Sequence, residues 1–132
     1  MHFLMTNQRI LTLQISYLFL CIGWNVYGLW CIAEGERPLG PTASFEVITL
    51  LALIMGSLLI CYKKHWSSGY MLMSLLILLL GGYAIVNGLT RDPFLWSSTA
   101  AWYSGISINI LGVLSFVLQL SLLKKKLNKK PL

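Results

Sequence analysis

Three cysteines could carry redox chemistry if their spacing allowed two of them to bond. Cys21 and Cys31 bracket the aromatic-rich stretch CIGWNVYGLWC, and Cys61 ends a later apolar run. Because an α-helix rises about 1.5 Å per residue, Cys21 and Cys31 are about 15 Å apart on one helix, whereas a disulfide needs Cα atoms closer than about 7 Å. We therefore expect three separate thiols that act as small packing residues. An intermolecular bond of Cys31 stays open as an alternative.

Metal binding and proton transfer have few residues to use. His2 and His65 lie in separate polar segments, and neither pairs with a nearby cysteine or acid. Charged residues inside a membrane are costly and therefore mark functional sites. The apolar runs contain none except Glu46, which lies close to the beginning of the second run. The sequence therefore predicts no metal, no cofactor and no enzyme activity.

The remaining candidates for function are amide side chains and this one acid. Asn25, Asn87 and Asn109 fall towards the same end of their apolar runs, and Glu46 lies near that end of its own run. Together they predict an outward-facing polar cluster that binds a polar or cationic group. The other interpretation is that these amides only form interhelical hydrogen bonds, each worth about 0.6 kcal/mol. Both interpretations stay open at this point.

Four apolar runs must position these side chains. The sequence of 132 residues is 57% hydrophobic and 11% charged, with a mean hydropathy of +0.74, whereas soluble domains carry about 25% charged residues. A hydrocarbon core about 30 Å thick requires about 20 mostly apolar residues per helix. Four stretches have this length: 10–33, 43–62, 69–89 and 99–123. They predict an all-α membrane protein with one four-helix domain over residues 1–132 and a basic tail at 124–132.

The distribution of charge predicts the orientation of this bundle. Of the ten cations, only Arg37 and Arg91 lie in the first and third loops, and the other eight lie in the N-terminal segment, the second loop or the tail. Cytoplasmic segments of membrane proteins are enriched in Lys and Arg. We therefore expect both termini in the cytoplasm and an up-down-up-down antiparallel bundle. The net charge of +6 then reflects topology, and nucleic acid is not an expected partner.

Aromatic residues near the ends of the runs, Trp24 and Trp96 among them, are interpreted as anchors at the membrane interface, with an aromatic ligand cage as the alternative. Small and weakly polar residues also recur along each run at spacings close to a heptad. A repeat of about 3.5 residues keeps such a seam facing a partner helix, and small residues let helices approach closely in lipid. We expect the seam to face the interior of the bundle, where Gln14 and Gln119 bridge the first and fourth helices, or in part to face a second copy. The seam consists of Gln14, Cys21, Gly28, Gly56, Gly81, Gly88, Gly105, Gly112 and Gln119.

These observations favour a membrane protein that acts through protein or lipid contacts, either as an accessory subunit of a membrane complex or as an immunity-type protein that binds an intruding partner. Its expected partners are the lipid bilayer and either another membrane protein or further copies of itself. The alternative is a small oligomeric transporter or channel that uses the Asn25, Glu46, Asn87 and Asn109 cluster. The expected location is the bacterial cytoplasmic membrane, or the endoplasmic reticulum in a eukaryote, where the ending KKPL fits a dilysine retrieval signal.

Overall fold

The computed structural model describes residues 7–129, and all regular structure in this range is helical. Four long helices dominate it, with one short 3-10 turn, η1, between the last two. All four are long and apolar enough to cross a membrane, so the predicted all-α class with four such helices is confirmed. The elements are α1 (Asn7–Ala33), α2 (Phe45–Lys63), α3 (Ser67–Thr90), η1 (Pro93–Leu95) and α4 (Thr99–Asn128).

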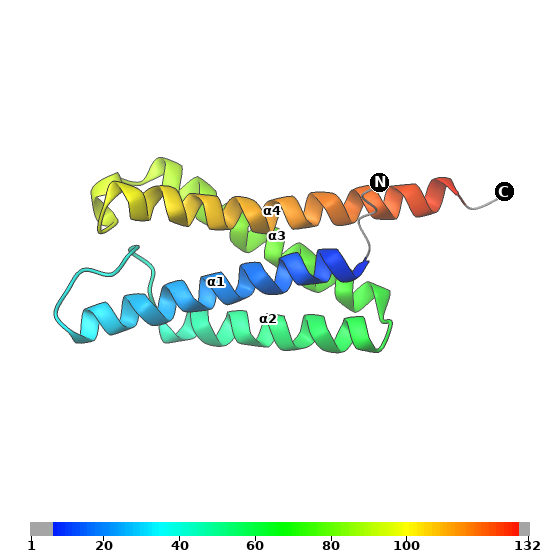
Figure 1. Ribbon diagram of the computed structural model, residues 1–132, viewed down its shortest axis with the longest axis horizontal. Coiled ribbons are helices and arrows are strands. Elements are labelled where there is room, and N and C mark those ends of the chain that lie inside the picture. The colour runs from blue at the N-terminus through cyan, green and yellow to red at the C-terminus, as the bar shows by residue number, and fades with distance from the viewer. Residues whose placement is uncertain (1–6, 130–132) are drawn as a thin grey trace.

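The four helices close into a ring. Each long helix packs against its neighbours in the chain, and α1 also packs against α4. In Figure 1 the helices lie alongside one another, and the connections 34–44 and 91–98 lie at one end of the bundle. We call this the loop end. The short connection 64–66, the first turn of α1 and the last turns of α4 lie at the opposite end, the lysine end.

Local sequence determines where several helices begin and end. The Ser44 hydroxyl accepts a hydrogen bond from the Val47 N–H at the beginning of α2, as N-cap serines do. At the end of α1, Gly35 has a φ of 79°, a conformation that glycine adopts without steric cost. The N–H groups of Gly35 and Glu36 return to the carbonyls of Ile32 and Cys31, which is the Schellman pattern of helix termination.

Helix α4 extends past the predicted end at residue 123 and continues to Asn128. Lysine and leucine are good helix formers, and lysines near a helix C-terminus interact favourably with its dipole. The helix therefore continues beyond the end of the apolar run. Residues 130–132, which complete the basic tail and the dilysine ending, lie outside the described residues, as does His2.

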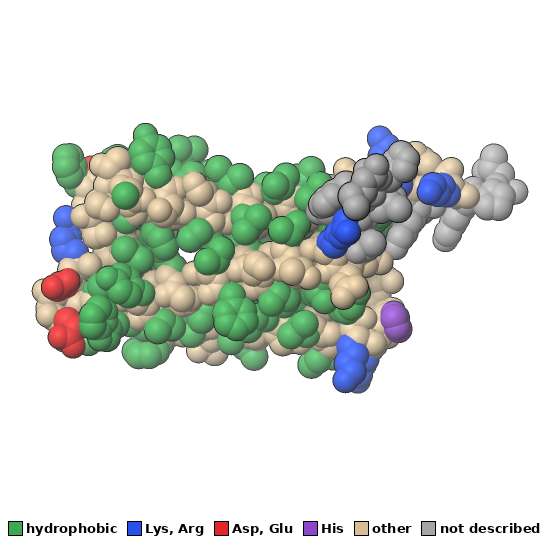
Figure 2. Space-filling view, viewed as in Figure 1, with side chains coloured by type: hydrophobic (Ala, Val, Ile, Leu, Met, Phe, Trp, Pro, Cys, Tyr) green, Lys and Arg blue, Asp and Glu red, His purple; other side chains and the backbone are tan. Residues whose placement is uncertain are grey.

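The bundle buries several polar side chains within an otherwise apolar core, and many large apolar side chains lie on its outside. Gln14, Ser74 and Ser115 are completely buried, whereas the large apolar side chains of Phe19 and Leu53 are more than half exposed. Figure 2 shows such hydrophobic side chains along the whole length of the bundle. In lipid there is no hydrophobic force between helices, and polar groups associate inside instead. The pattern indicates a membrane protein.

Glycines of the predicted seam allow close contacts at five of six positions. A methyl group at Gly112 would lie 2.7 to 2.8 Å from the ring of Tyr17, and one at Gly81 would lie 3.1 Å from the Asn109 carbonyl oxygen. Gly56 differs, because nothing lies within 4 Å of a methyl group placed there. Gly56 therefore makes no close contact inside the described bundle. The other three seam glycines, with the residues they contact, are Gly28 with Ala43, Gly88 with Ile106 and Gly105 with Trp24.

Candidate functional site

A closed hydrogen-bond network surrounds Gln14 in the half of the bundle nearer the lysine end. The Gln14 amide nitrogen donates to the Ser74 hydroxyl and to the Gln119 side-chain oxygen, both at 3.0 Å. Its oxygen accepts a hydrogen bond from the Tyr70 hydroxyl. The Gln14–Gln119 bond joins the two helices that we expected it to join, while Ser74 and Tyr70 add a link to α3. Because both polar atoms of Gln14 are paired, this network is a structural crosslink.

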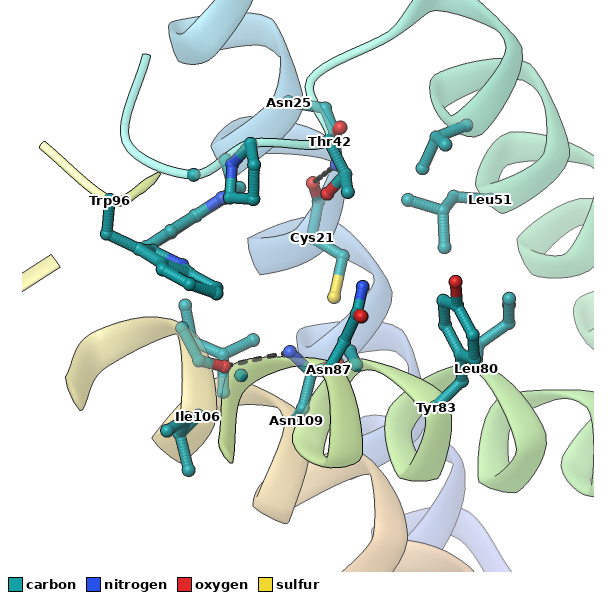
Figure 3. A pocket seen from close by; sticks show the side chains of 18 of the residues that line it. Cys21, Asn25, Thr42, Leu51, Leu80, Tyr83, Asn87, Trp96, Ile106 and Asn109 are labelled. Atoms are coloured by element: carbon teal, nitrogen blue, oxygen red, sulfur yellow. Dashed lines mark hydrogen bonds between the residues drawn. The ribbon is translucent and has the colours of Figure 1, made fainter. Parts of the chain in front are cut away.

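The half nearer the loop end contains a cavity of about 270 Å³. Its lining comes from all four long helices, from residues 40–42 of the first connection and from Trp96 of the third. Figure 3 shows this loop-end cavity from close by. Its position between the helices, next to both connections of the loop end, makes it the candidate functional site.

Three of the four residues of the predicted polar cluster line this cavity: Asn25, Asn87 and Asn109. Glu46 does not, because it is exposed in the first turn of α2 and its neighbour Val47 lines the cavity instead. Successive residues on a helix point about 100° apart. Glu46 therefore points away from the cavity, although it lies close to the same end of the bundle as the three asparagines. The structure brings the three amides together and leaves the acid outside.

Asn25 has a fixed side-chain orientation. Its Nδ2 donates to the carbonyl oxygen of Cys21 at 2.9 Å, and because a carbonyl can only accept, the nitrogen must face it. The Oδ1 atom is buried and has no hydrogen-bond partner among the described residues, and Asn25 is one of the residues that line the cavity. The whole residue is only 6% exposed. A buried unpaired acceptor lowers the stability of the folded protein by about 1–3 kcal/mol. A hydrogen bond donated to this oxygen would therefore stabilise the protein.

Asn109 is held in a similar way on α4. Its Nδ2 donates to the carbonyl of Gly105 at 2.8 Å, and its Oδ1 accepts a hydrogen bond from the Tyr17 hydroxyl at 2.9 Å. Asn87, by contrast, makes no side-chain hydrogen bond within the described chain. Figure 3 shows its amide pointing from α3 towards Cys21 of α1. Asn87 is therefore the amide that is free to contact a bound molecule.

The two connections at the loop end hold each other in place beside the cavity. The backbone N–H of Ser97 donates to the carbonyl of Leu39 at 3.2 Å. The Arg37 guanidinium donates to the carbonyls of Trp96, at 3.3 Å, and Phe94. These bonds position the indole of Trp96, whose Nε1 would lie 3.2 Å from a methyl group at Gly40. A tightly packed loop therefore supplies part of the lining.

Gly40 and Thr42 also line the cavity, although the sequence did not predict them as site residues. For Trp24 and Trp96 the sequence favours interface anchors, with an aromatic ligand cage as the alternative, and both residues line the cavity. The sequence carried a usable signal for Trp24, because it immediately precedes Asn25 on α1. It carried none for Trp96 and Gly40, since hydrogen bonds between distant connections bring them to the site.

The three cysteines are free thiols at three separate positions. Cys21 lines the loop-end cavity, Cys31 is buried near the end of α1, and Cys61 is buried near the end of α2. The Cys61 sulfur would lie 2.7 Å from a methyl group at Gly69, so it fills space between α2 and α3. Because Cys31 is only 4% exposed, an intermolecular bond there would require α1 to open.

Comparison with known proteins adds no family to this description. No protein-family model matches the sequence, and no curated protein or solved structure is similar to it. The site must therefore be interpreted from its own chemistry.

Proposed function

We propose that this protein is an integral membrane protein whose loop-end cavity binds a small polar molecule. The observation that carries the proposal is Asn25, which lines a cavity of about 270 Å³ and whose Oδ1 atom is buried without a partner among the described residues. Buried polar groups are nearly always hydrogen-bonded, and unpaired groups are especially costly in lipid. A ligand that donates to this oxygen removes the cost.

Binding, rather than catalysis, is the role that the lining supports. The residues that line the cavity include asparagines, tyrosines, tryptophans, a threonine and a cysteine, but no acid, histidine, lysine or arginine. General acid–base catalysis uses groups that exchange protons near neutral pH. Amides and indoles recognise a molecule by hydrogen bonds and ring contacts without exchanging protons with it.

The proposed topology places both termini in the cytoplasm and runs the helices up-down-up-down through the bilayer. It is supported by the charge at the two ends: Figure 2 shows the acids at the loop end and most cations in view at the lysine end, as the positive-inside bias predicts. The loop-end cavity then lies in the outer half of the membrane. In a bacterium this is the cytoplasmic membrane, and in a eukaryote the endoplasmic reticulum is the proposed location.

A second proposal is that α2 contacts another membrane protein or a second copy of this chain, as an accessory subunit or an oligomeric transporter would. It is supported by Gly56, where a methyl group would have no other helix or side chain of the described bundle within 4 Å. Thr49 and Ala52, both exposed, share its helix face by their spacing. Small residues on an open face allow another helix to approach.

Ligand-dependent stabilisation in detergent tests the first proposal. A molecule that binds only the folded state raises the unfolding temperature by mass action, so a panel of small amines, alcohols, amides and carboxylates should contain compounds that do so. Asn87→Leu should abolish their effect, because it removes the free amide. The matched control, Asn128→Leu at the exposed end of α4, should preserve it.

The same preparation separates the two proposals. A panel without any stabilising compound, together with a stoichiometric membrane partner retained in mild detergent, would contradict ligand binding and support the accessory role. A homodimer that also responds to ligand would support an oligomeric transporter instead.

A further inference from the structure

We infer that the ligand of the loop-end cavity is a small primary ammonium ion, with its N–H groups facing amide oxygens and its apolar part against aromatic rings. This inference rests on the proposed function, since it names the ligand class of the same site. It follows from three features: the direction of the amides, the distribution of charge and the size of the cavity.

The amides present oxygens rather than nitrogens. The Nδ2 atoms of Asn25 and Asn109 both donate to a carbonyl four residues earlier on their own helix, so their nitrogens are occupied and their Oδ1 atoms face away from those carbonyls. The Asn25 oxygen has no partner. The Asn109 oxygen accepts one bond from Tyr17 and keeps a second lone pair. The matching ligand is therefore a donor with several N–H groups, which an ammonium ion provides.

The balance of charge at the loop end, four acids against two arginines, favours a cation over an anion. No lysine or arginine lines the cavity. The loop end carries all four acids of the chain, whereas Arg37 and Arg91 are the two arginines there. The guanidinium of Arg37 is engaged by the carbonyls of Phe94 and Trp96. Acids near a cleft raise the local concentration of cations and speed their association. The acids at the loop end are Glu34, Glu36, Glu46 and Asp92.

The size of the cavity and its aromatic lining indicate what the apolar part of the ligand looks like. A volume of about 270 Å³ lies just below the usual range of ligand pockets, about 300–1,000 Å³, so the ligand is an amine with a compact apolar body. Rings of Trp24, Tyr83 and Trp96 line the cavity. Aromatic faces attract ammonium groups as well as apolar surface, so they can stabilise the charge without an acid in the lining.

Three probes with the same ring but different charge test this inference: cyclohexylammonium, cyclohexanol and cyclohexanecarboxylate. Binding is followed by tryptophan fluorescence of the full chain in nanodiscs, since Trp24 and Trp96 line the cavity. We expect cyclohexylammonium to bind at least about tenfold more tightly than cyclohexanol, and cyclohexanecarboxylate not to bind, because the acceptors and the nearby acids favour only the cation.

Variants at Asn87 separate a specific site from unspecific partitioning into the membrane. Asn87→Leu should abolish binding of cyclohexylammonium, whereas Asn87→Asp should tighten it, because a carboxylate at this position attracts the ammonium directly. Asn128→Leu should bind like the unmodified protein. Equal effects of cyclohexylammonium on all three variants would overturn the inference, because they would show partitioning rather than a site.

The outcomes distinguish this inference from the proposed function. If cyclohexanol or cyclohexanecarboxylate binds as tightly as cyclohexylammonium and Asn87→Leu abolishes that binding, the cavity is a ligand site but the ammonium assignment is wrong. If cyclohexylammonium fails to bind while another compound of the panel binds, the assignment is equally wrong. Only a failure of all probes and of the whole panel contradicts the proposed function itself.

Discussion

Two buried amides on α1 have opposite environments. Gln14 uses both of its polar atoms in bonds to α3 and α4, whereas Asn25 leaves its oxygen unpaired. A fully paired buried network stabilises a fold, and an unpaired group destabilises it. Natural proteins retain such costs mainly at functional sites. The contrast assigns a structural role to Gln14 and supports a binding role for Asn25.

Replacement of each amide by leucine, which has a similar size but no polar atom, should change stability in opposite directions. Gln14→Leu leaves partners on α3 and α4 unpaired, so the free energy of unfolding should fall by about 1–3 kcal/mol. Asn25→Leu removes the unpaired acceptor and one hydrogen bond, so stability should stay level or rise by up to about 1 kcal/mol. Thermal unfolding in one detergent compares the two. A similar loss in both variants would show that the Asn25 oxygen is satisfied in the membrane.

At the scale of the helices, Tyr17 connects α1 with α4 and also lines the loop-end cavity. Its hydroxyl donates to Asn109, and its ring lies on Gly112. The glycine lets the ring pack directly against the α4 backbone, which brings the hydroxyl within reach of the amide. The same contact therefore holds the helices together and orients one of the three asparagines of the cavity.

Alanine substitutions at two seam glycines test this packing. Gly112→Ala places a methyl group 2.7 to 2.8 Å from the Tyr17 ring atoms, so it should lower stability by about 1–3 kcal/mol and weaken ligand binding by displacing Tyr17. The control is Gly56→Ala, where nothing lies within 4 Å. It should be neutral or raise stability by up to about 1 kcal/mol, because alanine is the better helix former. Thermal unfolding and probe binding are measured together. If Gly56→Ala alone lowers the apparent size of the protein in detergent, the exposed face of α2 is an oligomer contact.

At the scale of the whole molecule, the two ends of the bundle differ in charge and in structure. The loop end has two longer connections that are hydrogen-bonded to each other and next to a cavity. The lysine end has one short connection and most of the cations. In the proposed topology, a ligand that approaches from the outer side meets acids first, and the lysine end faces the cytoplasm.

Reporter fusions test the orientation. A fluorescent protein fused after Leu132 should fluoresce in bacterial cells, because it folds in the cytoplasm, whereas alkaline phosphatase at the same position should be inactive. Phosphatase inserted after Gly35 in the loop end should be active, because disulfides form outside the cytoplasm. Phosphatase activity at Leu132 would reverse the proposed topology and place the cavity in the inner half of the membrane.

The sequence alone determined the helical class, the four apolar helices and the bridge between Gln14 and Gln119. Hydrophobic length is a local property, and polar residues inside apolar runs must pair with each other in lipid. It also selected Asn25, Asn87 and Asn109, because they share a depth. Only the tertiary structure decided that Glu46 stays outside the cavity, since this depends on helix rotation. The tertiary structure also decided that Gly40 and Trp96 complete the lining, because hydrogen bonds between distant connections place them there. The tertiary structure also decided that the Asn25 oxygen has no partner, because this depends on which groups the other helices bring near it.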